Sequence, residues 1–153
     1  EVEELLILPL IARTRSIVDD AQSLEAERTQ LFMAIRQYES MVNSFVHYKK
    51  IAVTDRGELS ITPEKQHRGV LDWRHLSSGE KQILILLTQA LLSGRSPMVY
   101  VADEPELSLH VIWQEKLLHA LTKIAGQCQF IVATHSPDIA SGFGDRVIDL
   151  ELA

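Results

Sequence analysis

Apolar residues recur through residues 17–45 at alternating steps of four and three, which is the spacing of a heptad seam. The pattern predicts one long helix that packs along another helix. It fits a coiled-coil or helical-hairpin arm, and it also fits an amphipathic helix on an ordinary core. Pro9 predicts a turn or the end of an earlier helix. Arg28 alone interrupts the seam, whose members are Ile17, Ala21, Leu24, Leu31, Ile35, Tyr38, Val42 and Phe45.

The periodicity then changes to that of strands. Apolar residues alternate over 51–53 and again over 59–61, on either side of the segment DRGE. This arrangement predicts a β-hairpin with Gly57 in its turn. Residues 63–75 are polar and irregular, so no regular element is predicted there.

The C-terminal half alternates helices with short apolar strands. Ser77, followed three residues later by Glu80, forms a capping-box pattern and predicts the start of a helix that runs to about residue 92. The first two strands are entirely apolar, as in the buried strands of a parallel sheet. The whole pattern predicts an α/β domain with a mainly parallel sheet and flanking helices. The remaining predicted elements are strands 98–102, 129–133 and 146–152, and helices 109–125 and 136–140.

Three loops at the ends of these elements carry the candidate chemistry. Asp103, Glu104 and Glu106 directly follow an apolar strand, where clustered carboxylates repel one another unless a cation compensates. The segment THS, residues 134–136, follows the next strand, and the segment LSSGE lies at a helix N-terminus, which favours an anion. Open α/β sheets place their ligands outside the carboxyl ends of strands. The three loops together therefore predict a magnesium–phosphate site.

Composition narrows the class of protein. The 153 residues are 46% hydrophobic and 24% charged, values typical of a globular domain. A net charge of −6 gives no overall attraction to nucleic acid, although a local basic patch is compatible with it. The single Cys128 excludes an internal disulfide and fits a reducing compartment. No apolar stretch approaches the roughly 18 residues that span a bilayer, so we expect a cytoplasmic protein without a membrane partner.

At these loops the sequence resembles a known family. LSSGEKQ resembles the signature motif of ABC-type ATPase heads, MVYVADEP resembles their Walker B strand, and IVATHS resembles their switch-histidine loop. The form DEPELSLH is similar to the RecF, OLD and Septu-type branch of soluble, SMC-related ATPases. The resemblance covers about residues 47–150 and implies the C-terminal lobe of a P-loop NTPase head. We therefore divide the chain into a helical arm, residues 1–48, and that lobe, residues 49–153.

The resemblance also implies roles for individual residues. Asp103 would hold Mg²⁺ through its water shell, and Glu104 would orient and polarise the water that attacks the γ-phosphate of ATP. His135 would contact the γ-phosphate and report its presence. The residues implied to contact the nucleotide of a second subunit are Ser77, Ser78, Gly79 and Glu80.

The implied function is ATP hydrolysis by a head that pairs with a second head, most simply in a homodimer. The head would control an effector such as a nuclease subunit, with DNA as a further partner, in anti-phage defence or DNA repair. No G-x-x-x-x-G-K-[ST] motif occurs in the 153 residues, and the chain begins at Glu1 rather than at methionine. We therefore expect a segment of a longer protein, inactive alone, whose phosphate-binding loop lies elsewhere.

Two other classes of function stay open on the sequence. Asp103, Glu104, Glu106 and His135 could instead ligate a metal in a nuclease or phosphohydrolase, although LSSGE would then have no role. A non-hydrolysing scaffold could use nucleotide only to hold subunits together. Glu106 and His110 receive no functional role from the motifs, and the residues predicted to serve in packing are Trp73 and Trp113.

Overall fold

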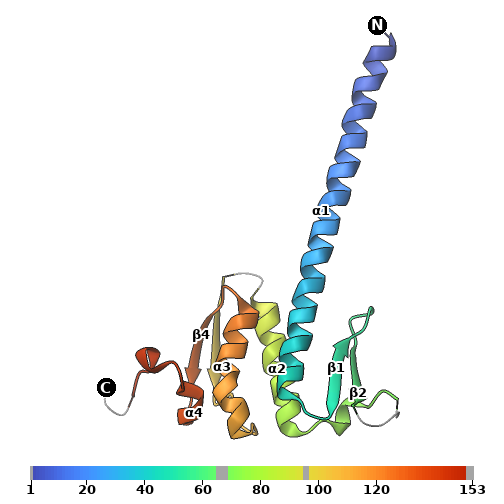
Figure 1. Cartoon of the computed structure of the whole chain (residues 1–153). Coiled ribbons are helices and arrows are strands. Elements are labelled where there is room, and N and C mark those ends of the chain that lie inside the picture. Colours follow the sequence, from blue (N-terminus) through green and yellow to red (C-terminus); the bar gives the residue numbers. More distant parts are fainter. Residues whose placement is uncertain (1, 65–68, 95–96, 151–153) are drawn as a thin grey trace. The chain divides into compact units, whose positions relative to one another are not determined.

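The computed structural model describes residues 2–64, 69–94 and 97–150. The chain divides within its first helix into two compact units, Glu1–Arg36 and Gln37–Ala153. None of the described helices is both long and apolar enough to cross a membrane. In chain order (Figure 1), the elements are α1 (Val2–Phe45), β1 (Lys49–Val53), β2 (Leu59–Pro63), the 3-10 helix η1 (Trp73–His75), α2 (Ser78–Ser93), β3 (Val99–Asp103), α3 (Val111–Ala125), β4 (Gln129–Ala133), α4 (Pro137–Ala140) and the 3-10 helix η2 (Gly144–Arg146).

Helix α1 is continuous through the whole heptad-patterned segment. Pro9 lies inside it, so the prediction of a turn or a helix end there is wrong. Proline removes one backbone donor, and the 44-residue helix continues through that local loss. Within the first unit the seam residues Ile17, Leu24 and Leu31 are all exposed.

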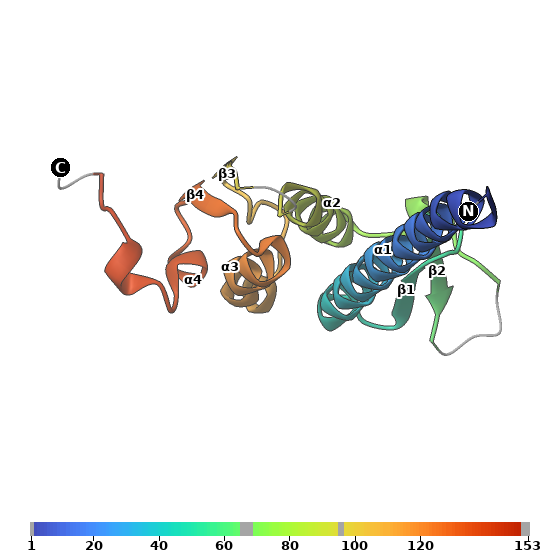
Figure 2. The same cartoon turned by 90° about the horizontal axis from the view of Figure 1, so that it is seen from above.

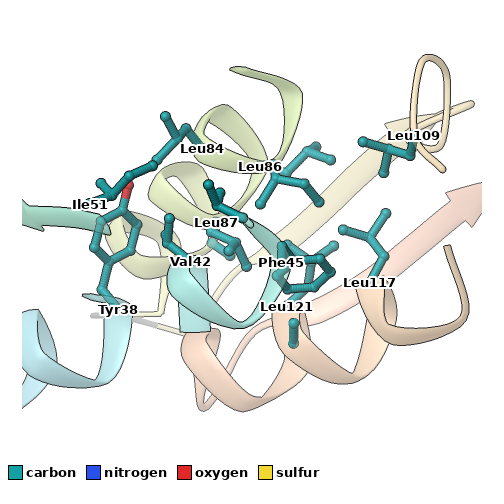
Figure 3. Packing of buried hydrophobic residues seen from close by; sticks show 14 of the residues in the cluster. Tyr38, Val42, Phe45, Ile51, Leu84, Leu86, Leu87, Leu109, Leu117 and Leu121 are labelled. Atoms are coloured by element: carbon teal, nitrogen blue, oxygen red, sulfur yellow. The ribbon is translucent and has the colours of Figure 1, made fainter. Parts of the chain in front are cut away.

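The last turns of α1 belong to the second unit and enter its core. Tyr38, Val42 and Phe45 are buried there, and the Tyr38 hydroxyl shares a hydrogen bond of 2.9 Å with Thr88 Oγ1 on α2. Figure 3 shows these side chains packed among leucines of α2 and α3. The predicted seam is therefore a core-packing face in this part of α1.

The core of the second unit lies between the end of α1, the hairpin and helices α2 and α3. Helix α2 begins with the predicted capping box, because the Ser77 side chain accepts from Glu80 N while the Glu80 side chain accepts from Ser77 N. Helices α2 and α3 lie side by side in both views (Figures 1 and 2). The packing prediction holds for Trp113, whose ring meets Phe45 edge-on with centroids 6.2 Å apart.

The hairpin forms as predicted. Strands β1 and β2 pair antiparallel with Ile51 opposite Ile61, and both side chains are buried. Gly57 has a φ of +78° in the turn, a conformation that glycine adopts without strain. The alternation of apolar residues therefore places one face of the hairpin on the core.

Strands β3 and β4 form the predicted parallel pair, with Asp103 opposite Ala133 at their carboxyl ends. The prediction that both strands are fully buried is wrong. Val99, Val101 and Ile131 are exposed, whereas alternate residues such as Phe130 face the core. Helices cover only one face of this two-stranded sheet among the described residues, so an apolar run here does not mean burial on both faces.

Two further predictions fail. Residues 147–150 form no strand, and Ile148 and Leu150 are about 80% exposed, since no neighbouring strand pairs with them. The last residues of the predicted strand, 151–152, lie outside the described residues. Trp73 is 60% exposed rather than packed, and Lys81 Nζ lies 4.9 Å from its ring centroid in a cation–π contact.

Candidate active site

The carboxyl ends of β3 and β4 bring two of the predicted catalytic residues together. Glu104 lies one residue past β3, and its backbone N–H donates to the Ala133 carbonyl at the end of β4, with an N–O distance of 2.8 Å. His135 follows β4 by two residues, and its Nε2 lies 3.5 Å from Glu104 Oε1. Two loops that are distant in sequence therefore place an imidazole beside a carboxylate.

Glu104 has an unusual backbone. Its φ is +45°, in the left-handed region that non-glycine residues enter at a cost of about 1–2 kcal/mol. The bond from its N–H to Ala133 stabilises this conformation, which turns the chain sharply away from the strand. Its side chain is 27% exposed, whereas that of His135 is 97% exposed, so solvent reaches the pair from the imidazole side.

Asp103 is the last residue of β3 and is exposed. Hydrated Mg²⁺ prefers carboxylate oxygens and keeps several waters. An exposed aspartate directly before a partly exposed glutamate supplies oxygens of the right kind, so the site is chemically suited to that ion. Among the described residues, no three His, Cys, Asp or Glu side chains gather closely enough to hold a metal on their own.

A partly buried polar network involves residues next to the pair in the sequence. Glu106 is 6% exposed, and its Oε1 accepts a hydrogen bond from the Thr134 hydroxyl. The same hydroxyl accepts from Ser136 N at 2.9 Å, and Ser136 Oγ donates to Gln114 Oε1 at 2.6 Å. The motifs contained Glu106 and Thr134 but gave them no role, and they gave no signal for Gln114, because only the fold makes these residues neighbours.

The predicted nucleotide-contact residues form the first turn of α2. Ser77 and Ser78 are exposed, whereas Gly79 and Glu80 are buried. Both carboxylate oxygens of Glu80 are engaged: Oε2 accepts from Ser77 N at 2.7 Å, and Lys49 Nζ donates to Oε2 at 2.7 Å and to Oε1 at 3.0 Å. Glu80 therefore holds this turn in place from inside the protein, and Lys49, which the sequence did not single out, holds Glu80.

Charge at Glu80 is stabilised despite its burial. Desolvation alone would raise the pKa of this carboxyl. Hydrogen bonds from Lys49 and Ser77 and the charge of Lys49 outweigh it and hold the pKa below its usual value. The Glu80–Lys49 pair is thus an ion pair under ordinary conditions.

Gly79 explains how the start of α2 meets the loop after β3. A Cβ at this position would lie 2.7 Å from the Ser108 carbonyl oxygen and 3.3 Å from the Trp113 ring, so only glycine fits. The close approach is therefore to this chain's own backbone. No hydrogen bond or ion pair within the described ranges joins the start of α2 to the Glu104–His135 pair.

His110, left without a role by the motifs, serves as a cap. Its Nδ1 accepts from the backbone N–H of Ile112 at 3.4 Å, which satisfies a free donor at the N-terminus of α3. The helix therefore begins at Val111, two residues later than predicted.

Comparison with known proteins now places the chain. A family model described as "AAA domain, putative AbiEii toxin, Type IV TA system" matches residues 6–141. The chain belongs to this family. It is also 39% identical over 75 residues to the retron Ec83 probable ATPase of Escherichia coli, a match that covers 42% of the chain and 14% of that protein.

A solved structure shows the same fold. The SMC head bound to the C-terminal winged-helix domain of ScpA superposes with a TM-score of 0.54 at 18% identity, over 74% of this chain and 39% of that one. The chain is therefore an α/β domain of this AAA-domain family whose fold matches part of an SMC head. It spans well under half the length of both proteins.

Proposed function

We propose that this chain is the C-terminal lobe of an ABC-type ATPase head that hydrolyses ATP with Mg²⁺ as part of a larger protein. The observation that carries the proposal is the pairing of Glu104 with His135, 3.5 Å apart, at the carboxyl ends of two parallel strands. Open α/β sheets bind their ligands at this edge. The family match and the SMC-head fold support the same reading.

Each residue of the pair has chemistry suited to phosphoryl transfer. Glu104 is partly exposed and rigidly placed, so its carboxylate can accept a proton from a water and aim that water in line with the γ-phosphate. His135 projects into solvent, where its imidazole can donate to a phosphate oxygen while its neighbour Glu104 orients it. Bound Mg²⁺ would neutralise phosphate charge, and Asp103 is the residue that would hold it.

The first turn of α2 supplies donors for a second nucleotide. Ser77 Oγ accepts the capping bond from Glu80 N, so its hydroxyl proton is left to donate to a phosphate. Ser78 is exposed beside it, and free backbone N–H groups of a helix N-terminus favour an anion. The phosphate-binding loop itself has no counterpart in the 153 residues and must be supplied from outside them.

The direct test is Glu104→Gln in the whole protein that contains this chain. Loss of the water-orienting carboxylate should lower ATP turnover by roughly 10²–10⁴-fold while nucleotide binding is retained. The matched control is Glu115→Gln on α3, which removes an exposed carboxylate. Turnover is followed by phosphate release, and binding by equilibrium titration with labelled ATP. Equal turnover in the wild type and Glu104→Gln would overturn the assignment.

The same experiment separates the alternatives. A wild-type protein that binds ATP without hydrolysing it would be a nucleotide-gated scaffold. No observation favours a metal-dependent nuclease, since the described residues offer no three-ligand metal cluster. The effector that the head would drive stays a prediction from the sequence: a separate subunit such as a nuclease, with DNA as its target.

A further inference from the structure

The loops after β3 and β4 are joined by two hydrogen bonds close to the Glu104–His135 pair. One is the backbone bond from Glu104 N to the Ala133 carbonyl. The other is the side-chain bond from the Thr134 hydroxyl to Glu106 Oε1. Thr134 directly precedes His135, and Glu106 lies two residues after Glu104. This second bond therefore links the residue before His135 to the residue two positions after Glu104.

The Thr134 hydroxyl is used as both donor and acceptor. It donates to Glu106 and accepts from Ser136 N at 2.9 Å. The second of these bonds links the residues before and after His135. Ser136 Oγ is in turn held by Gln114 of α3, whose Nε2 donates to the Leu109 carbonyl at 3.0 Å. The backbone is thus fixed on both sides of His135.

This fixation matters because, within the described part of the chain, the imidazole itself is held only by its contact with Glu104. The His135 side chain is 97% exposed, so no surrounding core selects its rotamer or direction. Its Nε2 lies 3.5 Å from Glu104 Oε1. For an exposed side chain, the placement of its backbone largely decides which positions it can reach.

Glu106 is an unfavourable residue for packing alone. Its Oε2 is buried and has no hydrogen-bond partner among the described residues. A buried acceptor without a partner destabilises the folded protein, and an apolar or amide side chain would avoid burying a carboxylate. A carboxylate kept at a destabilising position points to a role other than stability.

We propose that Glu106 and Thr134 are positioning residues, which set the distance and direction of His135 relative to Glu104 for the reaction on ATP. The inference rests on the proposed function and extends it to two residues outside the proposed catalytic pair. Glu106 provides a hydrogen-bond acceptor in the loop after β3. Thr134 binds that acceptor and so holds the loop after β4 at a set distance from it. Misplacement of a catalytic group by about 1 Å can lower a rate 10²-fold.

The decisive pair of variants is Thr134→Val and Thr134→Ser in the whole protein. Valine keeps the shape but removes both hydrogen bonds, so kcat for ATP should fall roughly 10- to 100-fold, with KM changed less than about threefold. Serine restores the hydroxyl and should return kcat to within about threefold of the wild type. A purely structural role would instead lower the melting temperature of both variants in proportion to their loss of activity.

Glu106→Gln tests the other end of the bond. Glutamine replaces the carboxylate by a weaker amide acceptor, so the bond to Thr134 should weaken and kcat should fall. The melting temperature should stay equal or rise, because a buried carboxylate is removed. If both residues act through one bond, Glu106→Gln combined with Thr134→Val should be no slower than Thr134→Val alone. Fully multiplicative losses would overturn the shared bond.

A measurement without catalysis separates failure of this inference from failure of the proposed function. Hydrogen exchange at the Ser136 amide, in nucleotide-free protein, should speed up in Thr134→Val and not in Thr134→Ser. A wild-type protein that hydrolyses ATP, with Thr134→Val equally active, overturns the positioning role alone. A wild-type protein without ATPase activity overturns the proposed function and the positioning role with it, whatever the exchange shows.

Discussion

The residues of each sequence motif are of two kinds: exposed residues that are available to a ligand, and buried residues that hold the loop. The motifs alone do not show which residue is of which kind. Glu80 lies in the signature-like segment beside Ser77 and Ser78, yet its carboxylate faces inward to Lys49. Glu106 lies in the acidic loop beside Asp103, yet it is buried and bonded to Thr134. In each motif an exposed residue is available for chemistry while a buried neighbour holds the loop.

The ion pair between Lys49 and Glu80 gives a prediction at this scale. Lys49→Met keeps most of the length of the side chain but leaves the Glu80 carboxylate buried without its cation, which should destabilise the fold by about 1–3 kcal/mol. Lys50→Met is the matched control, because Lys50 is exposed on the same strand. Chemical denaturation measures both, and equal stability of the two variants would show that the pair is not stabilising.

The pH dependence of the same pair has a definite sign. The pKa of Glu80 lies below its ordinary value of 4.5 in the folded protein, so the folded state binds its proton less readily than the unfolded chain does. Its contribution to stability is therefore present above about pH 4.5 and is lost as the pH falls through the folded value. In Lys49→Met this loss on acidification should be smaller, which denaturation curves at pH 3–6 would reveal.

At the scale of elements, short sequence patterns predicted the helices and strands that depend on neighbouring residues in the sequence. The capping box set the start of α2, the alternation around Gly57 set the hairpin, and the apolar runs set β3 and β4. The failures depend on neighbours that no local pattern contains. Residues 146–150 have the composition of a strand but pair with no other strand in the described chain, and Trp73 stays at the surface against Lys81.

The candidate site divides in the same way. The closeness of Glu104 and His135 could be predicted because each lies just past the end of a strand, and Asp103 ends one of these strands. The roles of these three residues stay predictions. The contacts of Lys49 and Thr134 could not be predicted, because Lys49 meets a residue 31 positions away and Thr134 one 28 positions away. Long-range partners of buried carboxylates come only from the fold.

The seam of α1 gives the prediction at element scale. Its first-unit members Leu24 and Leu31 are exposed in the described chain, and exposed heptad leucines are typical of a helix that packs along another. In the whole protein, Leu31→Asp with Ile35→Asp should cost several kcal/mol of local stability through unpaired buried charge. Hydrogen exchange along residues 17–36 measures it.

The control for this test lies on the opposite face of the same helix. Thr29→Asp with Met33→Asp introduces the same charges at the same four-residue spacing, at exposed positions. If both double variants exchange at the wild-type rate, no helix covers the seam. If both exchange faster to the same extent, the loss is one of helix propensity and not of packing.

At the scale of the molecule, the proposed nucleotide site has two parts that no hydrogen bond or ion pair joins among the described residues. The Glu104–His135 pair lies at the strand ends, and the exposed Ser77 and Ser78 begin α2. We expect two copies to complete the sites, with the first turn of α2 in one head facing the nucleotide held by the other. A two-fold pairing uses each part once and leaves no open interface.

ATP should therefore close two heads of the Glu104→Gln protein, whereas ADP should not. The γ-phosphate is the group that the Ser77 hydroxyl and nearby backbone N–H groups would bind, through charge-assisted hydrogen bonds that ADP lacks. Ser77→Arg places a bulky side chain at that phosphate and should abolish pairing while the monomer stays folded, since loss of an N-cap costs only about 1 kcal/mol. Light scattering with each nucleotide measures the change in mass.

A control variant, Ser77→Ala, distinguishes the bulk of the arginine from the loss of the N-cap. Ser77→Ala removes the same cap without adding bulk, so it should still pair with ATP, although more weakly, because one donor is lost. Pairing blocked equally by alanine and arginine would mean that loss of the cap disorders the first turn of α2. The shared site would be refuted by two results together. The mass would be the same with ATP and with ADP and in both variants, and cysteines placed near Ser78 would form no crosslink between heads. Contact across the first turn of α2 is what the shared site requires.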